Sequence, residues 1–370
     1  MNKPVSLYIH IPFCKSKCPY CDFYSARPEE DDVFDRYLAA LCARLAVYGE
    51  KYGERLLHTV YFGGGTPSVF GAKRLCRVFE KVKEQFNVAE NAEITTECNP
   101  ADVDVSFFET LKRGGFNRIS MGMQSANEAE LKILGRRHTA ETVREAVKAA
   151  REAGIDNVSV DLMLGLPNSS LETLKSSIDF CVALEADHVS AYILKIEPGT
   201  PFAKQELNLP DEDGTADQYL FAVNELKKRG YDQYEISNFA RPGKESRHNL
   251  QYWRCGEYLG LGPAAHSFME GRRFYFPRDL EDFFNGNAPT DDGAGGGFSE
   301  FAMLSLRLTE GLQRKICETR FENGGALFDG VLEGCKHLPK NLIHADYERI
   351  SLTAEGFLVS NAILAEILPG

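Results

Sequence analysis

Three cysteines near the start of the chain, Cys14, Cys18 and Cys21, follow the spacing C-x₃-C-x₂-C. Three thiolates in one loop can hold three corners of a cubane iron–sulfur cluster, whereas clusters bound by protein alone normally take four cysteines. If no fourth ligand comes from elsewhere in the chain, one iron is left open for a small molecule. The spacing therefore predicts a cluster that takes part in chemistry rather than one that only stores electrons.

Two other kinds of cysteine site are less consistent with the sequence. A zinc site would need a fourth Cys or His at a companion spacing, usually a second C-x₂-C or an H-x₃-H pair, and the chain has no such pair. A disulfide framework is disfavoured because cysteine is sparse and we expect no signal peptide. The remaining seven cysteines are scattered, and we expect Cys98 and Cys255 among them to fill core space as reduced thiols.

The composition fits a soluble protein with a substantial core. The chain has 370 residues, of which 43% are hydrophobic, with a mean hydropathy of −0.30 and a formal net charge of −12. No stretch approaches the roughly 20 apolar residues that a membrane-spanning helix needs. The acidic charge argues against an extended nucleic-acid surface, which would require a basic stripe. We therefore expect a cytoplasmic protein without a nucleic-acid partner.

Six short, mostly apolar runs alternate with amphipathic helical segments in the first half of the chain. Their length and apolar content are typical of strands buried on both faces, and the alternation predicts a parallel sheet with right-handed crossovers. The predicted strands are Val5–Ile11, Thr59–Phe62, Glu93–Thr96, Arg118–Met121, Val158–Leu164 and His188–Leu194. The predicted helices include Phe34–Tyr48, Ala72–Glu84, Ser106–Arg113 and Thr142–Glu152. The sequence thus indicates an α/β fold.

Polar and glycine-rich residues follow several of these predicted strands. They include the run 63–67 (Gly-Gly-Gly-Thr-Pro), Glu97, Gln124 and Asp161. In α/β barrels the carboxyl ends of the strands form the rim on which active sites are built. Turns alone would explain the glycines, but polar groups within or ending apolar strands cost free energy unless they are paired. We expect these residues to form a binding site.

An open iron would suit a chelating ligand such as an α-amino-carboxylate. The glycine run lets the backbone approach a ligand closely, and its carbonyl groups could accept hydrogen bonds from an ammonium group. Arg136 could pair with a carboxylate through its planar fork. Glu97 and Asp161 could accept hydrogen bonds from ribose hydroxyls, and Gln124 can both donate and accept. The set predicts a site for a nucleoside that carries an amino acid.

Together these motifs resemble the radical S-adenosylmethionine superfamily, and within it the whole chain resembles the HemN/HemW family of coproporphyrinogen dehydrogenases and heme chaperones. The resemblance implies a partial (β/α)6 barrel. It implies a [4Fe–4S] cluster on the three cysteines, with S-adenosylmethionine chelating the fourth iron. The residues that it places around S-adenosylmethionine are Tyr8, Gly64, Gly65, Thr66, Glu97, Gln124, Arg136 and Asp161.

Two departures weaken the resemblance to the dehydrogenase branch of this family. Its members typically carry a further cysteine two residues after the third one, where this chain has Phe23. They also carry an additional N-terminal segment, whereas here the cluster motif starts at residue 14. Oxygen-independent coproporphyrinogen III dehydrogenase, which decarboxylates propionate side chains, therefore stays as the alternative function. Another radical enzyme, such as a methyltransferase, is a second alternative.

A later motif resembles the heme-chaperone branch. Residues 248–253 match its H-N-x-x-Y-W pattern, and an imidazole can ligate heme iron beside the flat faces of Tyr252 and Trp253. We therefore predict heme ligation by His248, the alternative being a histidine that caps a turn beside core aromatics. His266 is a candidate second heme ligand, with a structural turn as its alternative. His10 is expected to hydrogen-bond a cluster sulfur or S-adenosylmethionine.

The expected function is a heme chaperone on a radical S-adenosylmethionine scaffold, delivering heme to respiratory haemoproteins. The predicted organisation is a barrel over 1–240, a heme-motif segment and linker over 241–297, and a C-terminal domain over 298–370. The composition of Asn285–Gly297 predicts a flexible connection. The last domain is expected to be mostly helical and winged-helix-like, with a docking surface for a heme acceptor at the membrane. The sequence leaves open whether the chain cleaves S-adenosylmethionine and whether it forms a homodimer.

Overall fold

One twelve-stranded sheet organises the chain up to Ala294 in the computed structural model, which describes residues 4–28, 30 and 32–368. Its strands are β1 (Val5–Ile11), β2 (Leu56–Gly64), β3 (Asn87–Cys98), β4 (Arg118–Gln124), β5 (Asn157–Leu164), β6 (His188–Ile193), β7 (Asp232–Gln233), β8 (Asn238–Ala240), β9 (Tyr258–Leu261), β10 (His266–Met269), β11 (Arg272–Tyr275) and β12 (Thr290–Ala294). Their order in the sheet is β12-β11-β10-β9-β1-β2-β3-β4-β5-β6-β8-β7. Strands β1 to β6 are parallel neighbours in chain order, which confirms the six predicted strands.

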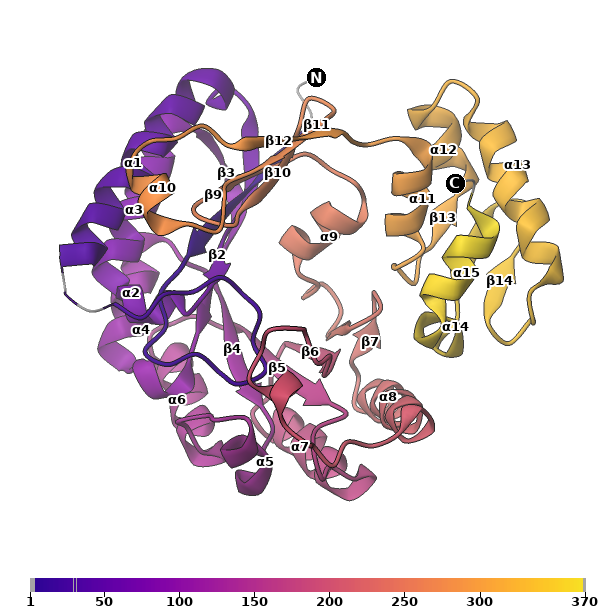
Figure 1. Cartoon of the computed structure of the whole chain (residues 1–370), viewed down its shortest axis with the longest axis horizontal. Coiled ribbons are helices and arrows are strands. Elements are labelled where there is room, and N and C mark those ends of the chain that lie inside the picture. Colours follow the sequence, from indigo (N-terminus) through magenta and orange to yellow (C-terminus); the bar gives the residue numbers. More distant parts are fainter. Residues whose placement is uncertain (1–3, 29, 31, 369–370) are drawn as a thin grey trace.

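The parallel strands have an apolar outer face and a polar inner face. On β4, Ile119, Met121 and Met123 are fully buried in the hydrophobic core, whereas Arg118 and Ser120 line an inner cavity. Because successive side chains of a strand point to opposite faces, this pattern requires helices on one side and a polar interior on the other. Figure 1 shows the helices outside the curved sheet, whose inner face opens toward the middle of the molecule.

Ten α-helices lie in the described residues up to Ala294 and form, with the parallel strands, the expected partial (β/α)6 barrel. They are α1 (Asp32–Tyr52), α2 (Pro67–Phe70), α3 (Ala72–Gln85), α4 (Val105–Gly114), α5 (Glu128–Ile133), α6 (Ala140–Glu152), α7 (Leu171–Ala183), α8 (Glu212–Lys228), α9 (Arg247–Trp253) and α10 (Leu280–Phe284), with 3₁₀ turns η1 (Pro100–Asp102) and η2 (Phe202–Lys204). Local sequence sets the ends of these helices. In α4, the side chain of Asp104 accepts a hydrogen bond from the amide of Phe107 at the start, and Gly115 ends the helix with a φ of 101°. Among the described residues, no helix combines the length and apolar character needed to span a bilayer.

The segment 241–297 adds four strands to the edge of the barrel. Strand β9 pairs parallel with β1, and β10, β11 and β12 continue the sheet in antiparallel pairs. The prediction of a flexible connection over Asn285–Gly297 is therefore wrong for its middle part, since β12 lies within it and pairs Asp291 with Phe274. Its glycines mark the ends of this edge strand, where a polar, exposed pattern is also expected.

The C-terminal part is mostly helical, as predicted, and contains a small antiparallel sheet of order β13-β15-β14. Its elements are α11 (Phe298–Ser305), β13 (Leu312–Gln313), α12 (Arg314–Arg320), α13 (Gly324–Gly334), η3 (Cys335–His337), β14 (Ile343–Ala345), β15 (Arg349–Leu352), α14 (Ala354–Leu358) and α15 (Ser360–Ile367). Figure 1 shows these helices as a separate group beside α9 and α8, on the side away from α1 and α3. The domain boundaries at 240 and 297 stay a prediction, and residues 1–3 and 369–370 of the two outer domains lie outside the described residues.

Candidate functional site

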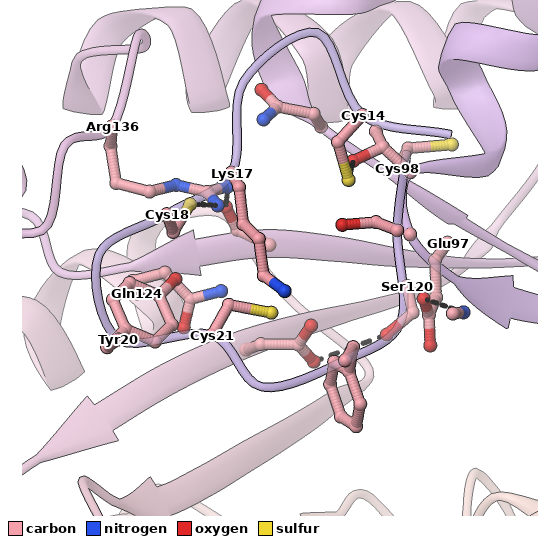
Figure 2. A pocket seen from close by; sticks show the side chains of 18 of the residues that line it. Cys14, Lys17, Cys18, Tyr20, Cys21, Glu97, Cys98, Ser120, Gln124 and Arg136 are labelled. Carbon is pink, nitrogen blue, oxygen red and sulfur yellow. Dashed lines mark hydrogen bonds between the residues drawn. The ribbon is translucent and has the colours of Figure 1, made fainter. Parts of the chain in front are cut away.

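A cavity of about 380 Å³ opens on the inner face of the barrel and gathers most of the predicted site residues (Figure 2). It is lined by Cys14, Cys18, Cys21, Gly64, Gly65, Thr66, Glu97, Gln124, Arg136 and Asp161. These residues come from the loop after β1, from the ends of β2, β3 and β4, from the middle of β5 and from the loop between α5 and α6. Tyr8 and His248 do not line it. The structure thus brings together the three predicted cluster ligands and seven of the nine predicted cofactor-binding residues.

The cysteine loop is tied to the glycine run by backbone hydrogen bonds. The amide of Gly65 donates to the carbonyl of Ile11 at 2.9 Å, and the amide of Thr66 donates to that of Phe13 at 2.7 Å. A Cβ atom on Gly65 would lie 2.8 Å from both carbonyl oxygens, so only glycine allows this close approach. The hydroxyl of Thr66 then lies 3.3 Å from the Cys14 sulfur.

A buried carboxylate fastens the first part of the cysteine loop to the rim of the barrel. Asp102, in η1, has a side chain that is 2% exposed. It pairs with the ammonium group of Lys15 at 2.7 Å and with the guanidinium group of Arg137 at 2.7 Å. Lys15 and Arg137 are both partly exposed. The two ion pairs with Asp102 therefore restrain the loop without burying the positive charges completely.

The donor set fits a [4Fe–4S] cluster. Figure 2 shows the sulfurs of Cys14, Cys18 and Cys21 around one open space, while the sulfur of Cys98, on the same cavity wall, points away from them. Within the described residues no three His, Cys, Asp or Glu side chains converge as they would on a single metal ion. A cubane presents a different iron to each thiolate, so its ligands need to surround a larger space. Burial raises the pKa of the Cys21 thiol.

Two carboxylates face the cavity from adjoining strands. Glu97 accepts hydrogen bonds from the hydroxyl of Tyr61 at 2.9 Å and from the amide of Gly64 at 3.2 Å. Asp161 accepts one from the hydroxyl of Ser120 at 3.2 Å. Burial raises the pKa of Glu97 to about 7 and that of Asp161 to about 6. Burial thus favours the protonated form of both groups in the ligand-free cavity, and a ligand that brings hydroxyl or ammonium groups would favour their ionised, hydrogen-bond-accepting form.

Backbone geometry aims Gln124 and Arg136 at the same space. Gln124 has a φ of 71°, which is uncommon for a residue other than glycine, and it ends β4 where its register to β5 shifts. Arg136 donates to the carbonyl of Gly122 at 2.7 Å and approaches the Cys18 sulfur at 3.6 Å. Its buried Nε has no hydrogen-bond partner. This guanidinium edge is thus free to receive an acceptor from a bound ligand.

Two residues on β1 are engaged with each other rather than with the cavity. The hydroxyl of Tyr8 lies 3.1 Å from Nδ1 of His10, and Nε2 of His10 lies 3.0 Å from the carbonyl oxygen of Tyr24. Both ring nitrogens of His10 are therefore used within the protein, and burial lowers its pKa to about 4. Tyr8 does not line the cavity and both ring nitrogens of His10 are bonded within the protein, so contacts of Tyr8 with S-adenosylmethionine and of His10 with a cluster sulfur or S-adenosylmethionine stay predictions.

The two predicted heme ligands differ sharply in accessibility. His248 is 1% exposed, with Nδ1 2.7 Å from the hydroxyl of Thr59 and Nε2 2.8 Å from that of Tyr252. Burial lowers the pKa of His248 to about 3, so the ring is neutral. Heme ligation by His248 stays a prediction, and in this structure both of its ring nitrogens are hydrogen-bonded within the protein. His266 is exposed on β10 and stacks on Tyr275, with 5.1 Å between the ring centroids.

The helix that carries the H-N-x-x-Y-W motif is anchored inside the barrel. The carboxylate of Glu93, a buried residue of β3, accepts hydrogen bonds from the backbone amides of Arg247 and His248 at 3.0 and 3.1 Å. This caps the first turn of α9, whose amides have no partners within the helix. Asn249, next to His248, lines the cavity. The motif therefore reaches the candidate cofactor site through its asparagine.

Sequence reasoning missed several residues of the cavity wall. They are inward-facing members of the predicted strands and of the motif helix: Tyr61, Arg118, Ser120, Ser190, Tyr192 and Asn249. Polar residues at every second strand position would have signalled them, because alternate side chains share a face. The strands were instead read only as apolar runs.

Comparisons with known proteins agree with this geometry. A family model of the radical SAM superfamily matches residues 8–181. The chain is 41% identical to the heme chaperone HemW of Haemophilus influenzae (98% of this chain, 97% of that protein) and 36% identical to that of Escherichia coli (98% and 97%). It is 36% identical to that of Mycobacterium tuberculosis (99% and 95%). Among solved structures, coproporphyrinogen III oxidase HemN from Escherichia coli matches with a TM-score of 0.86 at 24% identity (99% of this chain, 90% of that chain).

Proposed function

This chain belongs to the HemW family of the radical S-adenosylmethionine superfamily, and from that premise we propose that it is a heme chaperone, which binds heme and passes it to haemoproteins. The observation that carries the proposal is the similarity to proteins named heme chaperone HemW, at 41% identity over nearly the full length of both chains. The likeness to HemN, at 24% identity, concerns the fold alone.

A cluster and S-adenosylmethionine are the cofactors that this superfamily implies. The residues present fit them, since three thiols surround one space, Arg136 has an unpaired donor and Gly65 allows close approach. Cys14, Cys18 and Cys21 would hold the cluster, and Gly64, Gly65, Thr66, Glu97, Gln124, Arg136 and Asp161 would hold S-adenosylmethionine. Bound there, the pair would supply one-electron chemistry. The chain's own contribution is to orient the nucleoside and to fix its charged groups.

Heme ligation by His248 remains our proposal, and the structure defines what it requires. Either ring nitrogen must first lose a hydrogen bond, to Thr59 or to Tyr252. A ring so deeply buried also cannot meet a macrocycle while α9 stays in place. Heme loading by this residue therefore involves a movement of α9 away from β2, and His266, already exposed, is the natural second ligand to compare.

The C-terminal part is our candidate docking surface for the acceptor of heme, which we propose to be a respiratory haemoprotein at the membrane. Several large apolar side chains are exposed there: Met303, Ile316, Leu327, Tyr347 and Val359. Such residues are favoured at protein contacts. The same exposed apolar side chains could instead pack against a second copy of the chain. A measurement of the oligomeric state in solution tests this alternative, which a dimer would favour.

A heme titration tests the proposed function. Heme is added to the cluster-reconstituted chain and its absorption spectrum is followed; saturable binding near one heme per chain is expected. His248→Ala should change the absorption spectrum of bound heme. The spectrum of His266→Ala then shows whether His266 is a second ligand to the heme iron. The absence of saturable binding in the wild type would refute the proposal.

The dehydrogenase alternative is tested in parallel. Anaerobic incubation with coproporphyrinogen III, a reductant and S-adenosylmethionine is expected to give no protoporphyrinogen. Formation of that product together with 5′-deoxyadenosine would instead assign the chain to the dehydrogenases. Phe23, which is 69% exposed at the mouth of the cavity, adds no fourth motif thiolate for such a reaction.

A further inference from the structure

An arginine at the inner side of the cavity has no partner in the protein. Arg118 is the first residue of β4, faces inward with Ser120, and is 2% exposed. Its guanidinium group makes no hydrogen bond or ion pair with any of the described residues, and its Nε is fully enclosed without an acceptor. A guanidinium carries five N–H donors and stays charged, so burying it unpaired is unfavourable.

Two other arginines, the buried Arg314 and the half-buried Arg136, show that this is unusual for the chain. Arg314 donates to the carbonyl of Tyr347 at 2.6 Å and pairs with Asp329. Arg136, on the same cavity, donates to the carbonyl of Gly122. Buried charges in proteins are as a rule paired or bound to a ligand. Arg118 therefore lacks an acceptor that the protein supplies to its counterparts.

The two carboxylates that line the cavity with Arg118 are hydrogen-bonded to other residues. Glu97 is bonded to Tyr61 and Gly64, and Asp161 is bonded to Ser120. Burial keeps the pKa of Asp161 raised, at about 6, although Arg118 acts in the opposite direction. A close ion pair would have lowered it. The hydroxyl of Thr95, the register neighbour of Arg118 on β3, is also buried without a partner.

We propose that Arg118 is the centre of an anion subsite that binds the carboxylate of a small organic molecule inside the barrel. A carboxylate matches the planar fork of a guanidinium and carries the single charge that one arginine can neutralise. A phosphate dianion would be repelled by Glu97 and Asp161 on the same walls. The subsite lies away from the cysteine loop and does not depend on the binding of heme, so it goes beyond the proposed function.

Carbon-13-labelled acetate, titrated into the full chain at constant ionic strength and followed by NMR, tests the subsite. Saturable binding of one acetate per chain is expected, with inorganic phosphate binding more weakly. Arg118→Met should weaken acetate binding at least about tenfold, and Arg118→Lys by about three- to tenfold, because lysine keeps the charge but loses the fork. Arg144→Met is the control, since that arginine lies on α6, pairs with Glu141 and is not part of the cavity wall, and it should leave the affinity within about twofold.

Three results would overturn the proposal: no saturable acetate binding, equal affinity in Arg118→Met, or tighter binding of phosphate than of acetate. If Arg118→Met does not fold, two other measurements test the subsite: the acetate affinity of Arg118→Lys, and the Nε–H resonance of Arg118 in the wild type, which should shift as acetate is added. Repeating the titration with saturating S-adenosylmethionine separates the two ligands. If S-adenosylmethionine displaces acetate and Arg118→Met weakens both equally, Arg118 serves the cofactor and the subsite is refuted. Heme binding by Arg118→Met should equal that of the wild type, so this test and that of the chaperone function fail independently.

Discussion

The imidazole ring of His248 stacks on the phenol ring of Tyr61, with 5.0 Å between the ring centroids and 24° between the planes. The hydroxyl of that tyrosine donates to Glu97, which lines the candidate cofactor cavity. One aromatic residue of β2 therefore contacts both the motif helix α9 and the site for S-adenosylmethionine. Any movement of α9 that exposes His248 removes a packing partner from the residue that orients Glu97.

Replacing Tyr252 by phenylalanine should strengthen heme binding if His248 is the ligand. The substitution removes the hydroxyl that occupies Nε2 of His248 and leaves the ring in place. A typical hydrogen bond contributes about 0.5–1.5 kcal/mol, so a gain of roughly two- to tenfold in heme affinity is expected. A heme titration followed by absorption measures it.

Tyr258→Phe is the matched control for that experiment. Its ring packs on the ring of Tyr252 with 4.5 Å between centroids, but its hydroxyl interacts with Arg273 rather than with His248. Heme affinity should stay unchanged in this variant. An unchanged or weaker affinity in Tyr252→Phe would argue that the heme iron is ligated elsewhere.

Substituting any one of Cys14, Cys18 and Cys21 with alanine should remove most of the cluster, since each thiolate would hold a different iron. Iron and sulfide analysis after anaerobic reconstitution provides the measurement, with about four irons per chain expected for the wild type. Cys98→Ala is the control, because this thiol lies on the same cavity wall but its sulfur points away from the other three. Loss of iron from the control as well would show that the assignment of the three ligands is incomplete.

The sequence was sufficient for the barrel and for most of its rim. Parallel strands covered by helices are apolar over most of their length, and glycine or polar residues at their ends stand out against that background. The run 63–67, Glu97, Gln124 and Asp161 were found in this way, and the structure places them on one cavity. Although far apart along the chain, they come together in space because the parallel strands that carry them lie side by side in the sheet.

What the sequence did not show depends on contacts between distant parts of the chain. Nothing near His248 shows that Thr59 occupies one of its nitrogens, because the two residues are 189 positions apart. Tyr61 and Arg118 lie inside predicted strands, where an apolar interior was assumed although a ligand-binding barrel has a polar one. The glycines around β12 were read as a flexible connection, yet the same composition suits an exposed edge strand.

Asp102→Asn should loosen the cysteine loop and speed the loss of the cluster. The substitution removes the negative charge that holds Lys15 and Arg137, both at 2.7 Å. Hydrogen bonds to charged groups contribute about 1.5–3 kcal/mol each, and part of this is recovered because the two cations are near water. We expect a loss of about 1–3 kcal/mol in loop stability and iron release to a chelator at least about threefold faster. Asp35→Asn, which breaks the exposed pair with Arg74, should have no effect on iron release; equal release from both variants would contradict the role of Asp102.

Glu97→Gln should make the ligand-free protein more resistant to unfolding at alkaline pH relative to the wild type. Burial raises the pKa of Glu97 from 4.5 to about 7, so the folded state holds this proton more tightly than the unfolded state does. The free energy of unfolding of the wild type therefore falls as the pH rises from about 4.5 to about 7, and the penalty is complete above that range.

Glutamine cannot ionise, so the free energy of unfolding of Glu97→Gln minus that of the wild type should grow by about 1–3 kcal/mol between pH 5 and pH 8. Using this pH-dependent difference cancels any constant effect of the amide on the bonds to Tyr61 and Gly64. Urea unfolding at both pH values gives the numbers, with Glu90→Gln, on the exposed part of β3, as the reference for replacing a surface carboxylate. A difference that is the same at pH 5 and pH 8 would mean that Glu97 stays ionised in the folded protein, held by donors that the cavity supplies without a ligand.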